Sequence, residues 1–232
     1  MFVKSQDTPN ITDNYQSEEN NGILYVNNSV GGDMNRKDTT TLVTETLIRC
    51  KMTDRKYYAR EVTFDYGTEH PKRVDVMQFV PNGTGYASDI EKGEFICYEV
   101  KSSYEDLYSG NGLNFFGEKN YIVTTMELAK RIQADIREGK IQEYIKKNFP
   151  ESSLNFGIIT IIPSTVDKHN TSSLYEEWQH PTELDLNKAW QTYTLTPCNS
   201  GRRTRGIVEM LFCMLRSKHS ATNYEDVEVK YG

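Results

Sequence analysis

The sequence predicts an α/β protein in which a central mixed β-sheet of about five strands is flanked by helices. Short segments rich in β-branched and aromatic residues alternate with longer segments whose apolar residues recur at helical spacing. Turns that contain glycine or proline separate these segments. A chain of 232 residues is long enough for one such domain with extensions.

The first part of the chain predicts one helix followed by three consecutive strands. Apolar residues recur at helical spacing over residues 41–53, and Asp38 or Thr39 is expected to cap this helix. The three strands form a meander because only short turn-rich segments separate them. They are expected over residues 57–66, 73–79 and 94–102.

The second part predicts two further strands in the core and two helices. A long helix is expected over residues 127–149, weakened at its centre by Gly139. The apolar, β-branched run over residues 156–162 is typical of a buried strand. The remaining expectations are a glycine-containing loop over 106–119, a strand over 120–125, an irregular polar segment over 164–190, a short strand over 192–196 and a helix over 203–216.

Changes in composition divide the chain into four segments. Residues 1–38 are polar and predict a flexible N-terminal arm, with one short strand at residues 22–26. The core is expected over residues 39–163, and a C-terminal extension with a basic helix over 164–218. Residues 219–232 form an acidic tail.

The composition excludes several classes of protein. No apolar run approaches the ~20 residues of a membrane-spanning helix, and the N-terminus has no apolar region typical of a signal peptide. The four cysteines are widely spaced without a C-x-x-C motif, which argues against a zinc site. We therefore expect reduced thiols in a cytoplasmic protein that is not attached to a membrane.

The charge distribution is informative because the net charge of −6 alone disfavours binding to nucleic acid. The segment from Arg202 to Lys218 contains five basic residues and one acidic residue. Arg202, Arg203 and Arg205 are therefore candidate contacts to a phosphate backbone. Basic residues in the first turn of a helix oppose the helix dipole, which favours a partner that uses them.

Two of the predicted strands carry side chains typical of metal-dependent phosphodiester chemistry. Asp75 lies within Val74-Asp75-Val76, and Glu99 lies two residues before Lys101. Because side chains alternate along a strand, Glu99 and Lys101 share one face while Val100 points into the core. Two carboxylates near one ammonium are costly to bury, and a divalent cation offsets their repulsion while polarising a phosphate.

The order of these elements, with an acid on the middle strand and Glu-x-Lys on the next, resembles the PD-(D/E)XK nuclease superfamily over residues 41–163. The resemblance is closest to the branch of MmcB-like DNA repair proteins and related phage nucleases. Val74 stands where the family name has proline. The matching segments are Val74-Asp75-Val76, Glu99-Val100-Lys101-Ser102-Ser103, Asp106-Leu107, Asn114-Phe115-Phe116-Gly117 and Asn120-Tyr121-Ile122-Val123.

The resemblance implies a restriction-endonuclease-like core and a role for each matching residue. Asp75, Glu99 and the carbonyl group of Val100 would bind Mg²⁺ or Mn²⁺. Lys101 would orient the attacking water or stabilise charge on the phosphate. Glu45, on the preceding helix, is the expected outer acid, and Glu61 on the adjacent strand is its rival.

The expected function is that of a Mg²⁺- or Mn²⁺-dependent nuclease that hydrolyses DNA in repair, replication or phage-related DNA metabolism. Ser102 and Asn114 are further candidate contacts to the nucleic acid, and Asp106 and Asn114 are also candidates for positioning the glycine loop. One alternative is a catalytically inactive module of the same fold that binds DNA or a protein. A second alternative is a structural or regulatory protein whose N-terminal arm binds a partner, and homo-oligomerisation also stays open.

Overall fold

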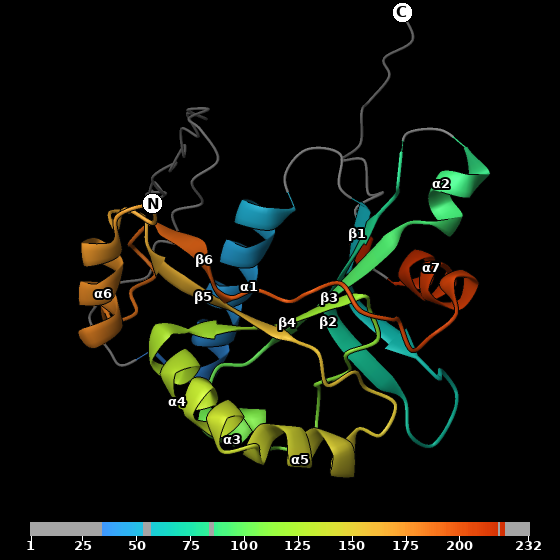
Figure 1. The fold of residues 1–232 in the computed structure, drawn as a ribbon, viewed down its shortest axis with the longest axis horizontal. Coiled ribbons are helices and arrows are strands. Elements are labelled where there is room, and N and C mark those ends of the chain that lie inside the picture. The colour runs from blue at the N-terminus through green and yellow to red at the C-terminus, as the bar shows by residue number, and fades with distance from the viewer. Residues whose placement is uncertain (1–33, 53–56, 84–85, 218, 221–232) are drawn as a thin grey trace, which may run out of the picture. The chain divides into compact units, whose positions relative to one another are not determined.

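The computed structural model describes residues 34–52, 57–83, 86–217 and 219–220. They form a mixed seven-stranded sheet in the order β6-β5-β4-β3-β2-β1-β7 (Figure 1). The β3–β4 and β4–β5 pairs are parallel, and all other pairs are antiparallel. The strands are β1 (Tyr57–Phe64), β2 (Lys72–Val80), β3 (Glu94–Val100), β4 (Lys119–Thr125), β5 (Gly157–Pro163), β6 (Trp190–Thr196) and the two-residue β7 (His219–Ser220).

Helices cover both faces of the sheet, which confirms the predicted α/β class. The blue helix α1 packs on one face against a cluster that includes Tyr98, Val100 and Trp190 (Figure 1). On the other face, α4 and α5 cover β4 and β5, and α7 covers β1. The helices are α1 (Arg36–Lys51), α2 (Ala87–Glu91), α3 (Tyr104–Leu107), α4 (Met126–Arg137), α5 (Lys140–Asn148), α6 (Thr171–Gln179) and α7 (Ile207–Arg216).

The first helix begins earlier than predicted, because its N-cap is Asn35 rather than Asp38 or Thr39. The side chain of Asn35 accepts a hydrogen bond of 3.0 Å from the amide of Asp38, which satisfies one of the free amides of the first turn. Residues 36–38 are therefore helical and not part of an arm. The predicted strand at residues 22–26 lies outside the described residues.

The helix predicted over residues 127–149 is two helices. Gly139 has a φ of 75°, in the left-handed region that ends α4 and redirects the chain into α5. The segment 164–190, predicted to be irregular, contains α6. The short helices α2 and α3 were not predicted either.

The C-terminal segment belongs to the sheet and its helical layers, which corrects the boundary predicted at residue 163. Strand β6 pairs with β5 along its length, and α7 packs on β1. His219 and Ser220, predicted as the start of a tail, pair with β1 as strand β7. Among the described residues, no helix is both long and apolar enough to span a bilayer.

Helix α7 begins at Ile207, later than the predicted start at residue 203. Its N-cap is Gly206, and Met210, Cys213 and Met214 form its buried face. Arg202, Arg203 and Arg205 therefore precede the helix. The argument that they oppose the dipole of its first turn does not apply.

Candidate active site

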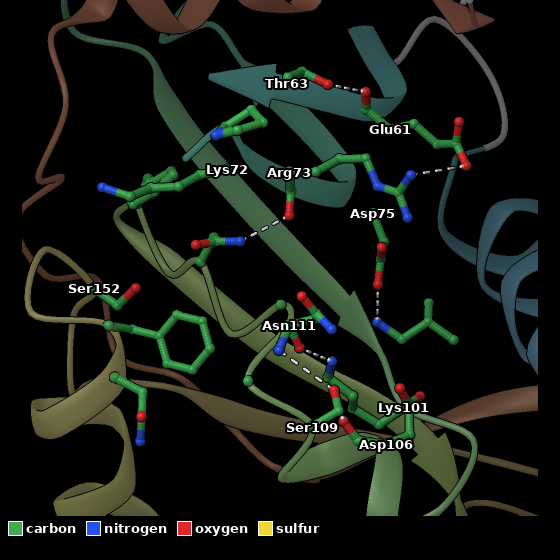
Figure 2. Close-up of a pocket in the computed structure, with 18 of the residues that line it drawn as sticks. Glu61, Thr63, Lys72, Arg73, Asp75, Lys101, Asp106, Ser109, Asn111 and Ser152 are labelled. Atoms are coloured by element: carbon green, nitrogen blue, oxygen red, sulfur yellow. Dashed lines mark hydrogen bonds and ion pairs between the residues drawn. The ribbon is translucent and has the colours of Figure 1, made fainter. Parts of the chain in front are cut away.

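A cleft of about 1080 Å³ opens where strands β2 and β3 separate (Figure 2). The ladder between these strands ends at the pair Val76↔Tyr98, so Asp75 and Glu99 are the next residues on their strands. Asp75, Val100 and Lys101 line the cleft, together with residues of α1, β1, the loop after α3 and residues 148–152. The tertiary structure thus brings the predicted acids and lysine to one place.

Asp75 is held by the neighbouring strand. The amide of Val100 donates a hydrogen bond of 2.8 Å to Asp75 Oδ2, which fixes one carboxylate oxygen. Burial raises the pKa of Asp75, while this hydrogen bond and the charges of Lys101 and Arg73 act in the opposite direction. The environment is therefore one in which an added cation would stabilise the ionised carboxylate.

Glu99 is completely buried and has one unsatisfied oxygen. Its Oε1 accepts a hydrogen bond of 3.0 Å from the amide of Asn114, whereas Oε2 has no hydrogen-bond partner. Burial, followed by repulsion from Asp75, raises the pKa of Glu99 well above its usual range. A buried, unpaired carboxylate oxygen is costly, and a cation bound there would remove that cost.

Lys101 follows directly after β3 and is also buried. Its Nζ donates a hydrogen bond of 2.7 Å to the carbonyl oxygen of Asn111. Gly112, with a φ of 74°, lies against both charged groups: a Cβ atom there would be 2.5 Å from Lys101 Nζ and 2.9 Å from Glu99 Oε2. Glycine is thus the only residue that leaves this space open.

The side chains of Ser102 and Asn114 both form hydrogen bonds within the protein. Asn114 is buried, and its side chain donates a hydrogen bond of 2.8 Å to the carbonyl oxygen of Arg73. The amide and hydroxyl of Ser102 are directed at Asp106 Oδ2, at 3.3 and 3.4 Å. Asn114 thus holds the loop over Glu99 in place, as predicted for a loop-positioning residue, and the roles of Ser102 and Asn114 as nucleic-acid contacts stay predictions. Asp106, which also accepts from Arg36, lines the cleft as well.

The expected outer acid, Glu45, is not part of the cleft, whereas its rival Glu61 is. Glu45 is exposed on α1 and forms a 3.0 Å ion pair with Arg60. Glu61 lies opposite Asp75, because the flanking pairs of β1 and β2 are Arg60↔Val76 and Val62↔Val74. Because Glu45 pairs with Arg60, which lines the cleft, its role as an outer acid stays a prediction.

Arg203 and Arg205 form ion pairs within the protein, away from the predicted acids. Arg203 binds Glu118 at 2.6 Å. Arg205 binds Asp65, Glu151 and Glu209, and its guanidinium lies 5.1 Å from the ring centre of Phe116. With the exposed Arg202 they line a second, smaller cleft of about 780 Å³, whose walls include Glu91, Glu94 and Glu118. This arrangement does not favour the predicted binding of phosphate by Arg203 and Arg205.

Sequence reasoning missed the basic residues that surround the large cleft. Arg36 on α1, Arg60 on β1, and Lys72 and Arg73 on β2 all line it, and we call these four residues the basic rim. Arg60 lies far in sequence from Lys72 and Arg73, and the pairing of β1 with β2 brings these three residues together. The spacing of Arg73 and Asp75, two residues apart on one strand, is the signal that would have identified Arg73.

The residues present are compatible with a hard divalent cation. Carboxylate and carbonyl oxygens are the ligands that Mg²⁺ and Mn²⁺ prefer, and the unpaired Glu99 Oε2 is such an oxygen. In the part of the chain that the structure describes, no three His, Cys, Asp or Glu side chains converge on one point. Asp75, Glu99 and the carbonyl group of Val100 are the candidate ligands, as the resemblance implies.

Comparisons with protein-family models, with curated proteins and with solved structures found no match to this chain. The fold that is established is therefore the α/β class itself, with an open mixed sheet between helices.

Proposed function

We propose that the protein is a metal-dependent phosphodiesterase. More specifically, we propose a Mg²⁺- or Mn²⁺-dependent nuclease that hydrolyses DNA. The observation that carries the proposal is the buried, unpaired Oε2 of Glu99, next in register to Asp75 and separated from Lys101 by one residue. Burying two carboxylates side by side without a function that uses a cation would only destabilise the fold.

Each residue has a distinct role in this proposal. Asp75 and Glu99 would hold the metal, with the carbonyl oxygen of Val100 as a further ligand. The bound ion would lower the pKa of a water molecule and offset the negative charge of the phosphate. Lys101, fixed by Asn111, would place its ammonium beside the reacting phosphate and stabilise the charge that develops there. Hydrolysis then breaks one phosphorus–oxygen ester bond, and water supplies the new oxygen.

The basic rim is the proposed binding surface for the DNA backbone. Arg36 and Arg73 expose more than half of their side chains, at 64% and 57%. The ion pair of Arg73 with Glu61 is exposed on both sides, so a phosphate can replace this carboxylate at small cost. The rim surrounds the carboxylates, which would guide the backbone of the substrate towards them.

The alternative is a catalytically inactive module that binds DNA or a protein partner through the same cleft. It is favoured by one observation: among the described residues, no three His, Cys, Asp or Glu side chains converge to hold a metal ion. A partner bound through residues 1–38, homo-oligomerisation, and a place in repair, replication or phage metabolism stay predictions.

Cleavage assays separate the two functions. The full-length protein is incubated with labelled single-stranded, duplex and branched DNA in Mg²⁺, Mn²⁺ or EDTA. We expect metal-dependent cleavage that falls at least about 100-fold in Asp75→Ala and Glu99→Gln. Arg137→Ala, an exposed residue on α4 outside the cleft, is the control for purification and folding. Equal cleavage by wild type and both carboxylate variants would contradict the proposal.

Calorimetric titration with Mn²⁺ tests the site without activity. Heat that disappears in both carboxylate variants is expected of the nuclease. DNA binding without such heat and without cleavage would instead support the inactive module.

A further inference from the structure

Arg73 is the basic-rim residue that lies nearest in sequence to the proposed metal ligands. It stands two residues before Asp75 on β2, and both side chains project from the same side of the strand into the cleft (Figure 2). The guanidinium therefore enters the same cleft as Asp75, and its side chain is more than half exposed.

The backbone of Arg73 is fixed to the loop that covers Glu99. The side-chain amide of Asn114 donates a hydrogen bond to the carbonyl oxygen of Arg73, and its backbone amide donates another to Glu99 Oε1. One buried residue thus sets the relative positions of the two strands. Binding of a ligand by Arg73 would therefore require ordering of its side chain but not of its backbone.

In the described structure the guanidinium of Arg73 faces Glu61. The distance between Arg73 Nη1 and Glu61 Oε1 is 3.9 Å, and both side chains are more than half exposed. An ion pair of this kind contributes little to stability. Glu61 has a φ of 51°, an uncommon backbone conformation for glutamate, at the position that faces Asp75.

We propose that Arg73 binds the phosphate group that lies over Asp75 and Glu99, and that Glu61 holds its guanidinium until the phosphate replaces it. The inference rests on the proposed function and assigns the residue that positions the reacting phosphate. Arginine suits this task because its planar group donates two parallel hydrogen bonds to phosphate oxygens. Glu61 is then a competitor of the substrate rather than a metal ligand.

The first test measures binding of a short labelled DNA duplex in Ca²⁺ and in EDTA, with the chain carrying Asp75→Asn to prevent cleavage. Added to this background, Arg73→Ala should weaken binding about tenfold and reduce the slope of log K against log salt by about one. Arg73→Lys should recover the salt slope but only part of the affinity, because lysine lacks the planar fork. Glu61→Gln should strengthen binding about two- to fivefold.

The second test uses the otherwise wild-type chain and compares kcat with KM. Arg73→Ala should lower kcat about 100-fold, as expected of a group that contacts the reacting phosphate, whereas Arg60→Ala should act mainly on KM. Arg137→Ala serves as the control outside the cleft. Thermal unfolding of each variant verifies the fold.

The outcomes distinguish this inference from the proposed function. Metal-dependent cleavage in which Arg73→Ala behaves like Arg60→Ala would overturn the role of Arg73 and leave the nuclease intact. DNA binding that requires Arg73, in a protein that never cleaves, would retain the phosphate contact and reject the nuclease. Weaker binding by Glu61→Gln would reject Glu61 as a competitor.

Discussion

Asp75 and Glu99 occupy the first positions beyond the last pair of the β2–β3 ladder, Val76↔Tyr98. The two acids therefore lie side by side where the strands begin to separate, and Glu61 on β1 lies opposite Asp75 on its other side. Three acids thus follow one line across three adjacent strands. Of the three, Glu61 is the one that pairs with a residue of the basic rim, Arg73.

The sheet changes its pattern at this same line. Ala59 and Val62 are three residues apart on β1 and yet contact the same core cluster, and so do Val74 and Met77 on β2. Regular alternation would place such pairs on opposite faces. The left-handed backbone of Glu61 accounts for the change, since a local irregularity redirects the side chains that follow. The irregularity and the acids coincide, as is common at functional sites.

Gly112→Ala should abolish cleavage while leaving the protein folded. The new Cβ would lie 2.5 Å from Lys101 Nζ and 2.9 Å from Glu99 Oε2, so one of these groups must move. Gly139→Ala is a matched control, because Gly139 has nearly the same φ but no atom within 4 Å of the added carbon. Both variants should lose about 1–3 kcal/mol of stability to backbone strain, measured by urea unfolding. Equal activity of the two would show that the space at Gly112 is not needed.

Arg205→Ala should destabilise the protein without a specific loss of DNA affinity. Arg205 joins Asp65, Glu151 and Glu209 and lies against Phe116, so its removal breaks three ion pairs and leaves only Lys72 beside Asp65 and Glu151. We expect a loss of about 1–3 kcal/mol in the free energy of unfolding. The exposed Arg202→Ala should change stability by less than about 0.5 kcal/mol. A large loss of affinity in a fully stable Arg205→Ala would restore Arg205 as a phosphate contact.

The thiols should react with a disulfide reagent in two distinct phases. Cys97 is completely buried, and burial raises its pKa to about 12, so it is neither accessible nor ionised near neutral pH. Cys198 and Cys213 are buried as well, and only Cys50 is half-exposed. We expect one fast thiol that Cys50→Ser removes, and three that react only after unfolding. A fast phase that persists in Cys50→Ser would contradict the burial of the others.

Glu94 should contribute to stability above its unfolded-state pKa and lose that contribution in acid. A hydrogen bond from Lys119, followed by one from Ser200, lowers the pKa of Glu94 in the folded protein. When the pKa of a carboxyl group is lower in the folded than in the unfolded protein, the group stabilises the fold at pH values above its unfolded-state pKa. This stabilisation is lost as the pH falls through the folded-state pKa. Wild type should exceed Glu94→Gln in urea midpoint at pH 7, and the difference should shrink as the pH falls through the folded-state pKa of Glu94. A difference that is constant with pH would exclude this ion pair as its cause.

The fold class and the strand-borne acids followed from local pattern. The predicted ends of strands β1, β2 and β3 differ from the observed ends by at most two residues. Side-chain alternation also placed Glu99 and Val100 correctly on opposite faces of the sheet. The prediction of one long helix was wrong at Gly139, where the chain forms two helices, although the sequence had indicated a weak point at that glycine. Helix α6 was missed because it is short and polar, so it has no buried stripe for the sequence to reveal.

The sequence by itself identified the chemically capable residues: Asp75 lies within one predicted strand, and Glu99 and Lys101 are two residues apart on the next. Only the tertiary structure decided their surroundings. Strand pairing placed Glu61 rather than Glu45 beside Asp75, collected the basic rim, and drew Arg203 and Arg205 into internal ion pairs. The physical reason is range: alternation acts between neighbours in the chain, whereas these contacts join residues far apart in sequence that meet only when the sheet forms.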